Sequence, residues 1–305
     1  LAALRFVPES RDAGHETYDI PGAVTVTAGL IALVYGIVST EQNGWGSPET
    51  VGFLALAVAL LTAFVVIERR SAEPLVRLDI FRVRTLRAAN VVMLVVASGL
   101  FAMFFFNTLY IQRVLEFSPL QAGLAFIPFT VGIGIGAGLS QPLMRTLGLR
   151  TTAGVGLVLG SVGMLALLTI DRDGSYLADV LPMMVPLSIG MGLTFVPVTL
   201  LATSGLQSDV AGLASGLFNT SQQIGGALGL AVLSTIAVNR SDDALSGLPG
   251  APNPIQLGDA LVTGFKGAFL AASVLLLAGL VLLLTMLKQR DLEQIPTDEP
   301  LRIPA

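Results

Sequence analysis

A cluster of uncharged polar side chains lies in the middle of an apolar stretch of 26 residues, 211–236, that carries no charge. The cluster runs from Asn219 to Gln223 and includes Gln222. On a helix, with about 100° between successive residues, five members of this stretch fall within about 80° of one another: Gly212, Gly216, Asn219, Gln223 and Gly226. In hydrocarbon, glycines let another helix approach closely, and amides must be hydrogen-bonded or face a wet cavity. This stripe therefore predicts contact with a neighbouring helix or with a transport path.

A further amide, Asn107, interrupts a bulky apolar segment and shares a helix side with Tyr110, three residues on. Two roles fit Asn107, lining a cavity or bonding to an adjacent helix, whereas Tyr110 is expected at the outer membrane interface. The candidate substrate contacts are therefore four amides, each with hydrogen bonding between helices as the alternative role: Asn107, Asn219, Gln222 and Gln223.

The sequence offers little other chemistry. It has one histidine, no cysteine, no His-Glu-x-x-His motif, no phosphate-binding Gly-Lys-Ser/Thr motif and no acidic pair inside an apolar stretch. We therefore expect neither an enzyme nor a cofactor or metal site, and no nucleic-acid partner. Carboxylates within the membrane are the usual proton carriers. Here Glu68, Asp179 and Asp259 lie only at the edges of apolar stretches.

Composition indicates an all-α integral membrane protein. Hydrophobic residues make up 53% of the chain and charged residues 12%, with a mean hydropathy of +0.78, against about 25% charged residues in soluble domains. A spanning helix needs about 20 apolar residues. Eight stretches approach or exceed this length: 20–39, 50–67, 88–111, 119–143, 151–170, 179–203, 211–237 and 260–287.

The basic residues predict the orientation of these eight helices. Taking the connecting loops alternately, one set holds 13 of the 17 lysines and arginines and the other holds 4. The positive-inside rule then places both chain ends in the cytoplasm of a multi-pass cell-membrane protein. The loop 68–87 alone has six arginines, and we expect it to contact anionic lipid at the cytoplasmic leaflet.

That basic loop also divides the chain. A helix pair, 20–67, precedes it, and a six-helix bundle, 88–287, follows it. The remaining segments are predicted to be a cytoplasmic linker after a missing helix, 1–19, and a cytoplasmic tail, 288–305. The chain begins at Leu1 followed closely by Arg5, which resembles the end of a preceding helix, so we expect a fragment.

Within 119–143, Pro128 predicts a weak point, and the pairs Gly132/Gly136 and Gly134/Gly138 predict close helix packing. Pro186 and Pro197 predict further kinks or weak points in 179–203. The segment 239–259, rich in glycine, proline and acid, is predicted to be a mobile outer loop.

Four stretches, in order, resemble the C-terminal portion of a major facilitator superfamily transporter. They are Arg5-Phe-Val-Pro-Glu-Ser-Arg11 with Tyr18-Asp-Ile-Pro-Gly22; residues 108–128, containing Phe117-Ser-Pro-Leu-Gln-Ala-Gly123; Gly190-Met-Gly-Leu-Thr-Phe-Val-Pro197; and residues 211–236. The chain is most similar in these stretches to the 14-helix drug:proton antiporters, the group that includes the multidrug exporters EmrB and QacA.

The resemblance implies two six-helix bundles joined by two extra helices, so that 20–67 is the linking pair and 88–287 the C-terminal bundle. It also implies proton-coupled efflux of small amphipathic or cationic compounds by alternating access. Within the same fold, an exporter of a lipid or natural product, or an importer, is the alternative. The many Gly-xxx-Gly faces also fit a protein of a different class, a membrane scaffold subunit that transports nothing.

Overall fold

A computed structural model describes residues 19–71, 74–76, 78–203, 208–246, 248 and 251–287. The predicted tail 288–305 and all of the predicted linker except Asp19 lie outside these residues. Within the described part of the chain, eight helices are long and apolar enough to cross a membrane. The predicted all-α membrane fold with eight spans is confirmed.

The first two spans form a hairpin, α2 (Ile20–Val38) and α4 (Pro48–Arg70), joined by the short α3 (Thr40–Asn43). Each begins with a side-chain cap followed by proline: Asp19 accepts from the Gly22 backbone N–H at 2.8 Å, and Ser47 accepts from that of Thr50 at 3.1 Å. Such caps satisfy N–H groups that a helix start leaves free.

The other six spans follow in order. They are α5 (Arg84–Leu109), extended by a π turn at Tyr110–Val114; α6 (Pro119–Ala125) with α7 (Ile127–Leu147); α8 (Leu149–Ala166), extended by the turn Leu167–Thr169; α9 (Leu181–Thr203), preceded by the π turn Tyr176–Val180; α10 (Ser208–Ser246); and α11 (Pro254–Met286).

Several helix boundaries differ from the prediction, among them the start of α11, at Pro254 instead of residue 260. The α5 helix begins at Arg84, so the basic loop 68–87 contributes its arginines partly from helix ends and partly from the short helix Leu78–Arg82. The α10 helix continues to Ser246, into the segment predicted to be a mobile loop. Residues 230–246 contain neither glycine nor proline, so nothing in the sequence stops the helix at the membrane surface.

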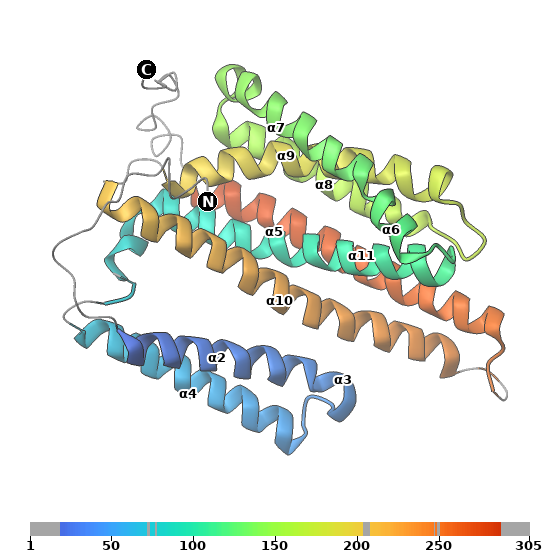
Figure 1. Cartoon of the computed structure of the whole chain (residues 1–305), viewed down its shortest axis with the longest axis horizontal. Helices are drawn as coiled ribbons and strands as arrows, with labels where there is room; N and C mark the ends of the chain where they lie inside the picture. The colour runs from blue at the N-terminus through green and yellow to red at the C-terminus, as the bar shows by residue number, and fades with distance from the viewer. Residues whose placement is uncertain are drawn as a thin grey trace, which may run out of the picture.

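Figure 1 shows α2 and α4 as a separate pair that lies along α10, while α5 runs through the middle of the other helices. Contacts join α5 to α9, α10 and α11, and join α9 in turn to α7 and α8. Of the most apolar part of each span, 67% is buried in α5 but 11% in α4. The α5 helix is therefore the core of the six-helix bundle, and α4 lies at its margin.

Glycines set the closest helix approaches. Gly132 and Gly136 of α7 both face α9, and a side chain on Gly136 would collide with the Ile189 carbonyl oxygen. This pair packs as predicted, whereas Gly134 and Gly138 have nothing within 4 Å of an added Cβ.

Of the three prolines predicted to be weak points, only Pro128 coincides with a break. The helix is interrupted at Phe126 because Pro128 has no N–H to donate to the carbonyl four residues earlier. Pro186 and Pro197 lie inside the continuous α9.

Candidate substrate site

Helices α5 and α10 pack against each other in parallel. Their contacts show which residues of α5 lie beside which residues of α10. Ser221 donates to Asn90 Oδ1 at 2.8 Å, and Ser98 donates to the Gly225 carbonyl at 2.8 Å. Further along, Phe105 and Phe106 line one cavity together with Ala237 and Val238. Later residues of α5 therefore meet later residues of α10.

This register separates the predicted substrate contacts. Asn107 is level with residues 237–238, about 27 Å along the axis from Asn219 at 1.5 Å per residue. The structure does not bring Asn107 together with the three amides of α10. Contact of any of the four with a substrate stays a prediction.

Asn107 is fully buried in α5. Its amide donates weakly to the Met103 sulfur at 3.9 Å, and its Oδ1 is without a hydrogen-bond partner in the described structure. Tyr110 is also fully buried, so it does not face lipid headgroups. Its hydroxyl donates to the Asp171 carbonyl at 2.7 Å.

The three amides of α10 lie differently. Asn219 and Gln223 are exposed, and Gln222 is half-buried. On the same face, Gly212 and Gly216 have nothing within 4 Å of an added Cβ. The predicted stripe is thus an open face along most of its length, and only Gly226, against the Phe101 ring, packs as a helix contact.

Beside this face runs a groove of about 500 Å³ between α2 and α10. Its walls are apolar side chains such as Ile31, Val34 and Leu228, and its polar lining residues are Gln223 and Tyr35. Gln223 therefore faces α2 as well as the open face of α10.

A different cavity, of about 530 Å³, lies between the end of α5, the end of α10 and the start of α11. Phe105, Phe106 and Phe265 supply aromatic walls, and Asp242 supplies a carboxylate at its margin. Aromatic walls with one carboxylate suit an organic cation, because a ring face and a negative charge both attract it. Sequence analysis missed Asp242 because it placed this residue in a loop. The absence of helix breakers in 230–246 is the signal that could have found it.

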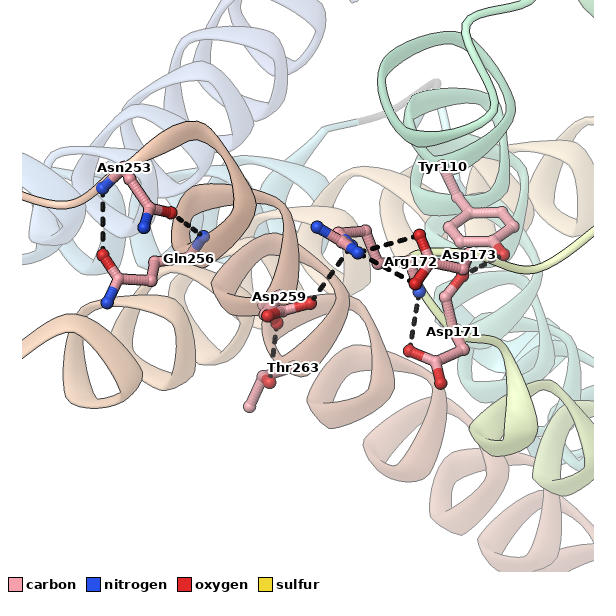
Figure 2. A network of polar contacts seen from close by, with 8 residues as sticks. All are labelled: Tyr110, Asp171, Arg172, Asp173, Asn253, Gln256, Asp259 and Thr263. Atoms are coloured by element: carbon pink, nitrogen blue, oxygen red, sulfur yellow. Dashed lines mark hydrogen bonds and ion pairs between the residues drawn. The ribbon is translucent and has the colours of Figure 1, made fainter.

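A polar network joins the connection before Tyr176 to the start of α11 (Figure 2). Arg172, in the connection before Tyr176, pairs with Asp173 at 2.8 Å and with Asp259 of α11 at 3.7 Å. The hydrogen bond with Asp173 raises the pKa of Arg172. A capping box between Asn253 and Gln256 caps the start of α11, one turn before Asp259. The network thus holds the first turns of α11, which line the Phe105 cavity.

Among the described residues, no group of three or more histidine, cysteine, aspartate or glutamate side chains could hold a metal ion.

Comparison with known proteins decides the family. The sequence profile described as Major Facilitator Superfamily matches residues 20–230. The chain belongs to this superfamily. Its members are transporters, not enzymes, in agreement with the sequence prediction.

Relatives with assigned names support the resemblance to drug exporters. The chain is 33% identical over 286 residues to the puromycin resistance protein pur8 of Streptomyces alboniger, covering 92% of this chain and 56% of that protein. It is 38% identical over 272 residues to the cephamycin export protein CmcT of Amycolatopsis lactamdurans, covering 88% and 54%. It is 29% identical over 236 residues to the multidrug resistance protein Stp of Mycobacterium tuberculosis, covering 76% and 43%. The chain spans about half the length of these curated relatives.

Proposed function

We propose that this chain is the C-terminal part of a proton-coupled exporter of small amphipathic or cationic compounds, which works by alternating access. The names of its relatives, for puromycin resistance, cephamycin export and multidrug resistance, support export of organic compounds. Since the chain matches about half of each relative, the transport path is proposed to lie between this bundle and a second one, as in other transporters built from two repeats.

The observation that carries the proposal is the Phe105 cavity, with aromatic walls and Asp242 at its margin. Its volume of about 530 Å³ lies within the range of about 300–1,000 Å³ usual for small-molecule sites. Asn219 and Gln223, on the open face of α10, are proposed to contact substrate on its way across, because exposed amides at membrane depth need a polar partner or water.

Proton coupling is proposed from the resemblance, and its carboxylate is expected outside this chain. The acidic residues of the described spans lie toward span ends, such as Glu68 near the end of α4 and Asp259 in the second turn of α11. A proton carrier works best nearer the bilayer midplane.

Efflux from cells that carry the full-length gene tests the proposal. We expect cells preloaded with a fluorescent cationic dye to lose it faster than cells without the gene, and a protonophore should abolish the difference. Export that persists after the protonophore would disprove proton coupling, and no export of any cationic or amphipathic compound would disprove the substrate class.

Two other functions have an observation in their favour. The resistance and export proteins among the relatives favour one natural product as substrate, in which case resistance would rise for one antibiotic and no dye would be exported. The open glycines Gly134, Gly138, Gly212 and Gly216 favour a scaffold subunit. A scaffold would co-purify with a stable partner and export nothing.

A further inference from the structure

A further groove lies between the start of α8 and the end of α11. It has a volume of about 550 Å³. Apolar side chains from both helices line its length, among them Val155 and Val158 of α8 and Leu280 and Leu284 of α11. Its floor is Gly154, where an added Cβ would lie 3.4 Å from Leu280 Cδ1. Val158 is 45% and Leu284 42% exposed, so these walls are open to the surroundings of the helices, which in a membrane are lipid chains.

A positive charge stands at the head of this groove. Arg150, in the first turn of α8, lines it and donates from Nη2 to the Leu284 carbonyl, in the last turn of α11. A guanidinium has five N–H donors. In the described part of the chain Arg150 Nε is buried without a hydrogen-bond partner, and no carboxylate pairs with this arginine.

The start of α8 adds to the positive potential. Its N-cap is Gly148, which offers no side chain to accept from the first backbone N–H groups. Gly148, Leu149 and Thr151 also line the groove. Free N–H groups and the helix dipole favour an anion beside a helix start. The charge lies at a helix end, at the membrane surface, while the apolar walls continue along the spans.

We propose that this groove binds one anionic phospholipid. The phosphate of the headgroup pairs with the free donors of Arg150 beside the start of α8, and an acyl chain lies along Val155, Val158 and Leu284. A soluble anion would use only the head of the groove and would leave its apolar walls uncovered. The basic-residue distribution predicts that this surface is cytoplasmic, where anionic lipids attract arginine. The site is separate from the arginine-rich segment 68–87.

Native mass spectrometry of the purified protein in detergent tests the site. Phosphatidylglycerol and phosphatidylcholine with identical acyl chains are titrated in parallel. We expect a single phosphatidylglycerol to bind at least about tenfold more tightly than phosphatidylcholine, because only the anionic lipid carries a net charge to pair with the guanidinium. Equal binding of the two lipids would overturn the proposal.

Two variants locate the lipid. Arg150→Gln should weaken phosphatidylglycerol binding about tenfold. The control is Arg145→Gln, which should leave binding unchanged, because Arg145 is an exposed residue at the end of α7 that does not line the groove. Val158→Trp fills the apolar wall without touching the charge and should also weaken binding. If Arg150→Gln acts and Val158→Trp does not, the site holds an anion alone and the proposal fails.

Two controls keep the result decisive. Arg150→Lys retains the charge, so it should restore part of the binding if Arg150→Gln acts through the headgroup, and a folding defect would instead show as a lower melting temperature of both variants. A chain ending at Leu287 removes residues 288–305. If only this shortened chain binds phosphatidylglycerol, the tail covers the groove and a lipid does not.

Discussion

Two buried asparagines of α5 differ in the hydrogen bonds that they make. Asn90 donates to the Leu86 carbonyl at 2.8 Å and accepts from Ser221 at 2.8 Å, so it ties α5 to α10. Asn107 makes one weak bond to Met103 and leaves its Oδ1 unpaired within the described structure. A buried carbonyl without a partner costs about 1–3 kcal/mol. The amide of Asn107 therefore does not stabilise this bundle in the way that the amide of Asn90 does.

Replacing each asparagine with leucine, a side chain of similar size, separates these roles. We expect Asn90→Leu to destabilise the protein by about 1–2 kcal/mol, because two hydrogen bonds are lost. Asn107→Leu should leave the stability unchanged or raise it, because an unpaired buried carbonyl is removed. Thermal unfolding in detergent measures both. Equal losses would mean that Asn107 has a structural partner, and the sequence-based view of it as a cavity residue would be wrong.

Neighbouring aspartates of α10 allow a matched test of the candidate substrate cavity. Asp242 lines the Phe105 cavity, whereas Asp243 lines a groove on another side of α10, with Arg240 and Gly267. In the full-length protein, Asp242→Asn should reduce export of cationic compounds at least about tenfold and that of neutral compounds little, since one charge interaction is lost. Asp243→Asn should change neither. Export rates at matched expression measure this, and equal effects of the two variants would exclude the cavity as a cation site.

At the scale of elements, α10 has two unlike faces. Gly225 and Gly229 approach α5 so closely that a side chain would overlap with the Leu94 carbonyl or with Ser98. Gly212 and Gly216 lie on the open face. The helix thus packs through one set of glycines, while the other set, with Asn219 and Gln223, lies on a face that the described residues leave open.

Replacing a glycine with alanine adds one methyl group and tests whether each face of α10 is packed. Gly225→Ala should destabilise the bundle by about 1–3 kcal/mol, because the backbone of α5 must move away. Gly216→Ala should be neutral or slightly stabilising, because alanine favours a helix over glycine and meets no neighbour. The melting temperature and the monodisperse yield of the purified protein measure the effect. If Gly216→Ala is as damaging as Gly225→Ala, the open face of α10 packs against something inside this chain.

These faces show how far sequence reasoning reaches. Length and hydropathy predicted eight spans, because a span needs only enough apolar residues. The spacing that identified Gly132 with Gly136 also identified Gly134 with Gly138, which have no neighbour within 4 Å of an added Cβ, because spacing does not show which side of a helix meets another helix. The stripe through Gly212 and Gly226 was chosen because it also carried amides. Glycines lie on several sides of α10, so periodicity alone could not show that Gly225 and Gly229 make the contact. The Phe105 cavity was missed because three helices distant in sequence form it.

At the scale of the whole molecule, the α2–α4 pair is attached to the bundle mainly through α10. Contacts join α2 to α10, and the hydroxyls of Thr40 and Thr235 are 3.4 Å apart beyond the end of α2. The groove between α2 and α10 includes Gln223. Any movement of α10 relative to the rest of the bundle would therefore change its contacts with the α2–α4 pair.

The orientation of all these elements rests on the distribution of basic residues and can be measured directly. The chain has no cysteine, so a single cysteine introduced at an exposed site reports its own side of the membrane. Thr146, in the last turn of α7, and Ala244, near the end of α10, are both exposed and are separated by three spans. We expect a membrane-impermeant thiol reagent to label Ala244→Cys in intact cells and Thr146→Cys only after the cells are opened, because the arginine-rich loops should be cytoplasmic. Gly46→Cys, between α2 and α4, should behave like Ala244→Cys. Labelling of Thr146→Cys and Ala244→Cys from the same side would mean that one of the helices α8, α9 and α10 does not cross the membrane, and labelling of Thr146→Cys alone in intact cells would reverse the predicted orientation.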